Sequence, residues 1–249
     1  METNIIITDV TRMRAPRVCV AGITDDGRCI RPIFEHEGVP ENWLYDEHFQ
    51  PVIRPFARVG LDLISSRPQP PHTEDWVVNP RVKTFSSGET NNNRLFLDQI
   101  LDPSVEDIFQ AKIHNDFGFY ICEGEGTRSL GTILVKMVCQ VKHSLKYKDW
   151  DYRVHFVDQA NREYRLKVVD LSFGYYVNYL RERRGMSCEE ISSMLTVKLH
   201  NATTYLRIGL TRPTWEEHPH CCSLQITGVY TFPDYLDGCC FADYRPNAG

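Results

Sequence analysis

Short segments in which apolar and polar side chains alternate recur along most of the chain, and they restrict its fold more than any other feature. Alternation with a period of two is typical of a β-strand that buries one face and exposes the other. Turn-forming residues separate the segments, as in Asp25-Asp26-Gly27. The predicted strands are residues 5–10, 17–22, 28–32, 58–65, 117–122, 132–142, 153–158, 163–170, 204–211 and 223–231.

The alternation also predicts which side chains each strand exposes. It places Arg165 and Lys167 on the solvent side of one strand, opposite a row of apolar residues. By the same rule, Tyr205 and Arg207 face solvent while Leu206 and its apolar neighbours face the core. Arginines therefore lie on predicted strand faces in the second half of the chain as well as in the first.

Helical patterns interrupt the strands in two places. Residues 94–113 hold two short helical patterns, and residues 173–184 hold a longer one. Ser187-x-x-Glu190 is a capping box, which predicts a further helix over residues 189–195. These inserts are too few for an alternating α/β fold, so the pattern favours small barrels.

The strands form two groups, which divide at the Gly-rich stretch near residue 127. We expect a first lobe over residues 1–127, with an irregular and helical insert at 34–113. A second lobe over residues 128–249 has a helical insert at 172–196. The predicted fold is mainly β with helical inserts, built as two small barrels packed together.

Charge is distributed unevenly over the chain. The formal net charge is −5, which disfavours a protein that coats nucleic acid indiscriminately. Residues 128–184, however, carry 12 basic and 6 acidic side chains. A local basic surface on an acidic whole is therefore expected in the second lobe.

Cysteine usage and the lack of long apolar runs bear on location. The nine cysteines are odd in number and scattered, unlike a disulfide framework, which predicts reduced thiols. No apolar run approaches the roughly 18 residues of a membrane span. Acidic Glu2 stands where a signal peptide carries positive charge. We expect a cytoplasmic protein with no membrane partner.

Four segments in order resemble a known family of bacterial proteins, the dual OB-containing domain family. They read ITDVTRMRAPRVCVAGI followed by GRCIRP, VVDLSFGYYV, YLRIGLTRP and LQITGVYTFPDYL. The resemblance runs from about Ile5 to Tyr235. It implies two OB-like barrels in one chain and a role in nucleic-acid transactions, and it transfers no catalytic residue.

OB folds bind single strands with basic side chains and stacking aromatics on one sheet face. DNA or RNA is thus the expected partner, in single-stranded or structured form. The alternative interpretation is that the arginines are solvated and the aromatics are core. The candidate binding residues are Arg12, Arg14, Arg17, Arg31, Arg165, Lys167, Tyr205, Arg207, Arg212, Tyr230 and Phe232.

Cysteines and histidines gather near the carboxyl end, and His218, His220, Cys222 and Cys239 are the candidate ligands for a metal site. Zinc sites use Cys-x₂₋₄-Cys turns, whereas adjacent cysteines in a strand point to opposite faces. The pattern therefore favours buried thiols, with no metal and no cofactor.

No complete catalytic motif is present in the sequence, although Cys19 or Cys222 with His220 would be a conceivable nucleophile pair. The leading hypothesis is a nucleic-acid-binding protein. One alternative is a protein-interaction module that partners a nucleic-acid-processing enzyme. The other is an enzyme that acts on nucleic acid or nucleotides through a site that the sequence does not reveal.

Overall fold

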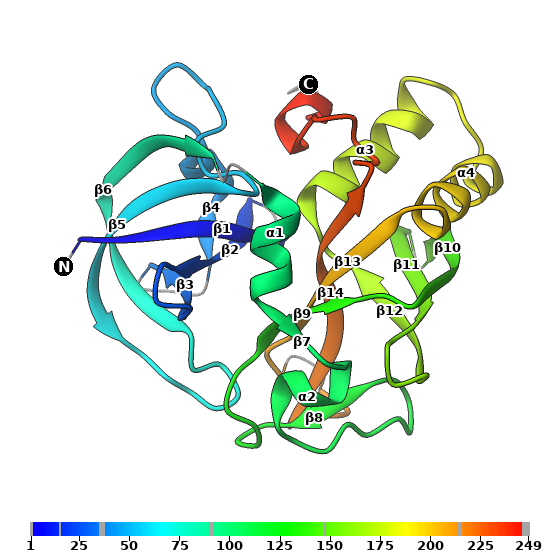
Figure 1. Cartoon of the computed structure of the whole chain (residues 1–249), viewed down its shortest axis with the longest axis horizontal. Coiled ribbons are helices and arrows are strands. Elements are labelled where there is room, and N and C mark those ends of the chain that lie inside the picture. Colours follow the sequence, from blue (N-terminus) through cyan, green and yellow to red (C-terminus); the bar gives the residue numbers. More distant parts are fainter. Residues whose placement is uncertain are drawn as a thin grey trace.

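The first strands close into a five-stranded barrel, seen on the left of Figure 1. The computed structural model describes residues 2–14, 16–34, 38–89, 92–146, 148–213 and 216–245, with the main chain alone for 82–89. The barrel strands are β1 (Glu2–Arg12), β2 (Arg17–Thr24), β3 (Cys29–Ile33), β5 (Ala57–Ser66) and β6 (Asp75–Glu89). Neighbours pair in the order β1-β2-β3-β6-β5-β1, and only β3 and β6 are parallel. This is the Greek-key order of an OB barrel.

The irregular segment between β3 and β5 seals one end of this barrel. It holds the short strand β4 (Val39–Pro40) and the 3₁₀ helix η1 (Glu41–Leu44). Trp43 and Leu44 are buried in the core of the first barrel. The indole nitrogen of Trp43 donates to the carbonyl oxygen of Pro80 at 3.2 Å, which ties the turn to β6.

A second barrel repeats this strand order. Its strands are β9 (Leu130–Leu134), β10 (Met137–Lys146), β11 (Asp149–Val157), β12 (Glu163–Val168), β13 (Thr203–Leu210) and β14 (Cys221–Phe232). β12 runs parallel to β14, as β3 does to β6. Between β9 and β10, the amide of Val135 donates to the carbonyl oxygen of Thr204 in β13. The next amide, that of Lys136, donates to the carbonyl oxygen of Val157 in β11. One bent strand, β9–β10, therefore closes the barrel.

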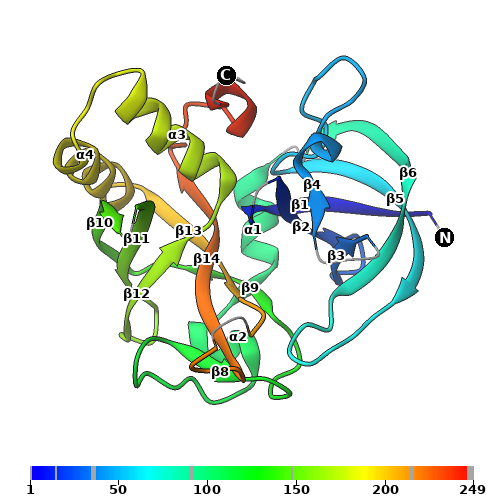
Figure 2. The same ribbon diagram turned by 180° about the vertical axis from the view of Figure 1, so that it is seen from behind.

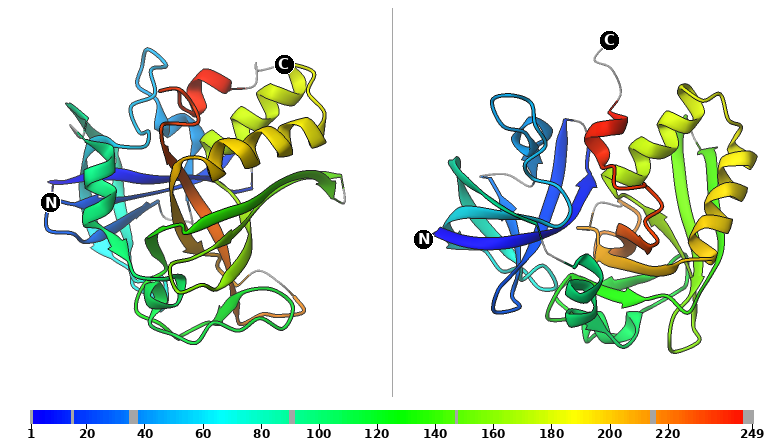
Figure 3. Two further views of the ribbon diagram at one scale, coloured as in Figure 1. Left: turned by 45° about the vertical axis from the view of Figure 1, so that its right-hand side comes forward. Right: turned by 45° about the horizontal axis from the view of Figure 1, so that its top comes forward.

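Two helices lie between β12 and β13 and cover one side of the second barrel (Figure 3). They are α3 (Leu171–Glu182) and α4 (Cys188–His200). The capping box of Ser187 and Glu190 is present, as predicted. α4 extends past the predicted end at residue 195, because Leu199 continues the buried stripe at i+4 from Leu195.

The segment between the two barrels packs with the second one. It contains α1 (Asn93–Gln99), β7 (Leu101–Asp102), α2 (Val105–Phe109) and β8 (Tyr120–Cys122). Val105 and Phe109 lie in the second core, although both precede the predicted division at residue 127. That division stays a prediction. The 3₁₀ helix η2 (Phe241–Tyr244) follows β14 and inserts Phe241 into the first core.

The barrels lie side by side (Figure 2). They meet through buried polar side chains. Arg207 of β13 donates to both carboxylate oxygens of Asp9 in β1 at 2.8 to 3.2 Å. Arg31 of β3 donates to Asp75 at 2.6 Å and to Ser129 at 3.2 Å. The inter-barrel network, as it is called below, consists of Asp9, Arg31, Glu74, Asp75, Ser129, Thr132, Arg207, Arg212 and Thr227.

The prediction that Tyr205 and Arg207 face solvent is wrong. Their exposed fractions are 1% and 2%. The outer face of β13 is covered by neighbours distant in sequence: Tyr205 donates to Asp98 of α1 at 2.6 Å, and Arg207 lies against the first barrel. Alternation identified the outer face correctly, but that face is an internal contact.

Among the described residues, no helix combines the length and apolar character needed to cross a bilayer.

Candidate nucleic-acid interface

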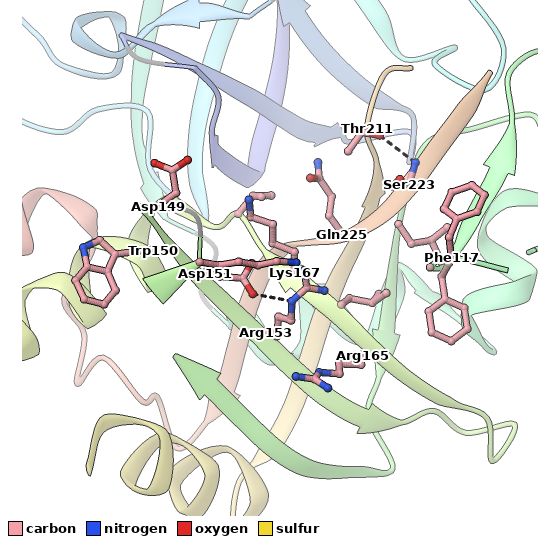
Figure 4. A pocket seen from close by; sticks show the side chains of 16 residues that line it. Phe117, Asp149, Trp150, Asp151, Arg153, Arg165, Lys167, Thr211, Ser223 and Gln225 are labelled. Carbon is pink, nitrogen blue, oxygen red and sulfur yellow. Dashed lines mark hydrogen bonds and ion pairs between the residues drawn. The ribbon is translucent and has the colours of Figure 1, made fainter. Parts of the chain in front are cut away.

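A groove of about 760 Å³ runs across the outer face of the second barrel (Figure 4). Its floor is formed by β11, β12 and β14, which contribute Arg153, Lys167 and Gln225. The register of the sheet brings these three together, because Arg153 lies opposite Lys167 and Lys167 opposite Gln225. Side chains directly opposite each other in neighbouring strands share a face of the sheet. The groove floor is therefore a row of hydrogen-bond donors.

Basic side chains outnumber acidic ones along this groove. Lys146, Arg153, Arg165 and Lys167 line it, against Asp149 and Asp151. Arg153 is held by Asp151, with 2.7 Å between Nε and Oδ2. Arg165 and Lys167 are exposed, as predicted from the alternation of β12. The groove thus presents a net positive surface on a chain whose net charge is negative.

Aromatic side chains stand on opposite sides of the groove, Trp150 on one and Phe117 on the other (Figure 4). The guanidinium carbon of Arg181 lies 3.7 Å from the centroid of the Trp150 ring, a cation–π contact that fixes the indole. Phe117 stacks on His218 with 3.7 Å between ring centroids and keeps 41% of its surface exposed. Each wall of the groove is therefore an aromatic ring that a neighbouring side chain holds in place.

The groove lies where OB folds bind oligonucleotides, on the outer face of the second and third strands beside two loops. β11 and β12 are the second and third strands of this barrel. Lys146 and Asp149 flank the connection between its first two strands. Thr211 and Ser223 stand at the base of the connection between β13 and β14, joined by a hydrogen bond of 2.9 Å from Ser223 N to Thr211 Oγ1.

The connection between β1 and β2 reaches the groove through the main chain of Arg12. The amide of Arg12 donates to the carbonyl oxygen of Val169, which lines the groove, at 2.8 Å. The Arg12 guanidinium stacks over the ring of Tyr175 in α3 at 4.9 Å. Arg12, Arg14 and Arg17 are exposed. The structure therefore places the main chain of Arg12 beside the groove that Arg165 and Lys167 line, and it does not place Arg14 or Arg17 among the lining residues.

The remaining predicted arginines form ion pairs within the protein. Arg31 and Arg207 are 7% and 2% exposed. The charge of Arg31 is balanced by Asp75 and Glu74, and that of Arg207 by Asp9. Arg212 pairs with the second oxygen of Asp75. The expected place of Arg31 and Arg207 on a solvated strand face is contradicted, because the two barrels pack on each other where β3 and β13 lie.

The predicted aromatics Tyr205, Tyr230 and Phe232 lie away from the groove, in a small cluster with Leu97 of α1. Tyr230 is 9% exposed, and its hydroxyl donates to the carbonyl oxygen of Thr8 at 2.6 Å. Phe232 packs edge-on against Tyr205, with 5.7 Å between centroids. These rings act as packing between the barrels and α1.

The candidate metal ligands near the carboxyl end do not converge. Within the described ranges, no group of three close ligand atoms includes His218, His220, Cys222 or Cys239. Cys222 lies in the second core, and burial raises the pKa of its thiol to about 11, away from a reactive thiolate. The ring of His220 is exposed and lies 3.4 Å from Glu123. Cys222 with His220 therefore lacks the activation that a nucleophile needs.

Of the groove residues, sequence reasoning named only Arg165 and Lys167; among those it missed are Phe117, Lys146, Trp150, Arg153 and Gln225. A signal for Arg153 was present: it precedes Val154 in the same alternation that revealed Arg165 and Lys167. For Phe117 and Gln225 no local signal exists, because their role depends on strands far apart in the sequence.

Comparison with known proteins agrees with this geometry. A search of curated protein sequences finds no match to the chain. The family model described as a dual OB-containing domain matches residues 4–229, which takes in both barrels nearly to the end of β14. With two barrels of OB strand order inside that match, the chain belongs to the dual OB-containing domain family.

Proposed function

We propose that the chain binds single-stranded or structured nucleic acid along the groove of its second barrel. The observation that carries this proposal is the row of Arg153, Lys167 and Gln225 across β11, β12 and β14, with Arg165 beside it. OB barrels commonly bind oligonucleotides on this face. The basic side chains would contact phosphates, while Phe117 and Trp150 flank the bases.

A single strand suits the groove better than an operator duplex. Duplex readers insert a recognition helix or a two-stranded ribbon into the major groove. Here the basic side chains lie on a concave sheet face between two aromatic walls. Unpaired bases present their faces to such walls, and stacking contributes about 1–3 kcal/mol per base. The polar groups of Thr211, Ser223 and Gln225 supply hydrogen bonds along the edge of the strand.

The test is the binding of a fluorescein-labelled oligothymidylate and its oligouridylate counterpart, measured by anisotropy across a salt series. Three phosphate contacts predict a slope of about −2 for log K against log salt with single strands. Arg165→Ala with Lys167→Ala removes two of them. We expect binding to weaken by about tenfold or more, and the slope to shrink by about 1.4.

The matched control is Arg28→Ala with Arg81→Ala, which removes the same charge from exposed positions on the first barrel. This control should keep both the affinity and the salt slope of the parent. Equal losses in the two double variants would contradict a specific groove. Absence of binding at low salt would reject nucleic acid as the ligand and favour the protein-partner alternative.

A further inference from the structure

Three side chains with different donor atoms converge beside β8, outside the groove floor. They are His114, Cys122 and Glu125, and a ring nitrogen, the sulfur and a carboxylate oxygen lie within 4.8 Å of one another. His114 and Cys122 are half-buried, and Glu125 is exposed. A nitrogen, a thiolate and a carboxylate are the three donor types that Zn²⁺ takes in proteins.

Two local main-chain structures, a turn and a β-bridge, hold these residues in place. The amide of Glu125 donates to the carbonyl oxygen of Cys122 at 3.1 Å, so that Cys122 and Glu125 occupy the first and last positions of a turn. Gly124 provides the positive φ of 84° within it. His114 and Tyr120 exchange amide-to-carbonyl hydrogen bonds of 2.9 and 3.1 Å, which fixes His114 beside β8.

A second thiol lies next to the first across the sheet. Cys221 of β14 is the direct antiparallel partner of Cys122. The neighbouring pair is hydrogen-bonded, because Glu123 donates to His220 at 2.8 Å. Cys122 and Cys221 therefore occupy a non-hydrogen-bonded position, where side chains share a face and lie closest. Cys222 points to the other face and lies in the core.

We propose that His114, Cys122 and Glu125 bind a Zn²⁺ ion, and that Cys221, which lies opposite Cys122 but outside the group of three, rotates in as the fourth ligand. Tetrahedral Zn²⁺ needs ligand atoms about 3.5 Å apart, given bond lengths of about 2.0–2.3 Å. Atoms within 4.8 Å reach that separation by small side-chain rotations. The ion replaces the thiol protons, which pass to solvent. Four protein ligands leave no open position, so the site is structural rather than catalytic.

The consequence of this site reaches the groove. Residues 115–119, which include Phe117, form the loop between the ligands His114 and Cys122. An ion that joins the two ends of this loop and β14 fixes one wall of the groove. Hydrogen exchange of residues 115–119 should therefore slow when Zn²⁺ is added to protein that has been stripped with a chelator.

The direct experiment adds Co²⁺ to the stripped, reduced full chain and records the absorption spectrum. We expect thiolate-to-cobalt charge-transfer absorption and tetrahedral d–d bands that saturate near one equivalent, and their loss on addition of Zn²⁺. Cys122→Ser and His114→Ala should weaken binding by about tenfold or more. Cys139→Ser, a half-buried thiol on β10, is the matched control and should leave the spectrum unchanged.

Glu125→Gln keeps the proposal testable if the other variants fold poorly, because residue 125 is exposed on a turn. It should also weaken Co²⁺ binding. A parent spectrum without thiolate charge transfer, or full binding by Glu125→Gln and Cys122→Ser, would overturn the site. No nucleic acid is present in these measurements, so they do not depend on the proposed groove.

Discussion

The two barrels share one strand order but use the outer face of their second and third strands in opposite ways. In the first barrel, Ala21, Ile23 and Arg31 on this face are at most 7% exposed, because the second barrel packs against them. In the second barrel, Arg165 and Lys167 on the corresponding face are exposed above a groove. The same fold thus supplies a docking face in one copy and a candidate ligand face in the other.

Charge follows the same division. The arginines of the first face and of its contact strand are matched by buried carboxylates: Asp75 for Arg31 and Asp9 for Arg207. Around the groove, four basic side chains meet only two acidic ones. A buried charge is tolerated only when it is paired, whereas an exposed one can remain available for phosphate. Burial therefore separates structural arginines from candidate binding arginines.

The largest expected effect concerns the inter-barrel network. Arg207→Ala leaves the carboxylate of Asp9 buried without its ion-pair partner, and we expect a loss of about 3–5 kcal/mol in the free energy of unfolding. Denaturant unfolding measures it. Asp9→Leu with Arg207→Met should recover part of the loss, because neither charge remains. If the Arg207→Ala variant kept its stability and lost only oligonucleotide affinity, Arg207 would be a binding residue rather than a structural one, which would contradict this account.

A pH dependence sharpens the contrast at the same contact. Burial and the neighbouring Arg31 and Arg212 lower the pKa of His72 to about 3. The unfolded chain takes up the proton near pH 6.5, while the folded chain does not. The contribution of neutral His72 to the free energy of unfolding is therefore fully present above about pH 6.5. It is lost as the pH falls toward about 3, by about 1.4 kcal/mol per pH unit.

His72→Asn should flatten this decline between about pH 6.5 and 4, as measured by denaturant midpoints at each pH. The matched control is His48→Asn, because His48 is exposed and contacts only Glu47 among the described ion pairs. Equal slopes for the parent and His72→Asn would contradict the buried position of His72.

The smallest effect on stability is expected in the groove. Arg153→Ala removes a partly exposed partner of Asp151, so the free energy of unfolding should change by about 0–1 kcal/mol. The same substitution should weaken oligonucleotide binding, because Arg153 lies opposite Lys167 in the row that forms the groove floor. Arg207→Ala and Arg153→Ala should thus have opposite profiles. Large destabilisation by Arg153→Ala would show that the groove arginine is structural.

Sequence periodicity predicted most strands and both inserts, since local alternation and capping depend on nearby residues. It did not reveal β6, the longest strand, in which Pro80 lacks an amide hydrogen and the pairing with β5 shifts register repeatedly. It also predicted residues 132–142 as one straight strand and missed the bend between β9 and β10, at which the chain changes its pairing partner from β13 to β11. These errors arise where pairing partners, rather than local sequence, decide the structure.

The candidate site was predictable only in part, for the same reason. Arg165 and Lys167 could be placed on an exposed face because, within the described residues, both side chains stay open to solvent on β12. Arg207 follows the same alternation, but its partner Asp9 stands 198 positions away along the chain. No local pattern separates an arginine that meets solvent from one that meets a second barrel. That distinction required the arrangement of the two barrels.

Hydrogen exchange of the full chain with and without a saturating oligothymidylate tests the central claim most directly. The account predicts slowed exchange at the start of β11, in β12 and at Ser223–Gln225 of β14, with β2 and β3 unchanged. Protection confined to β2 and β3, with the groove strands unaffected, would contradict it, because the ligand would then have opened the contact between the barrels.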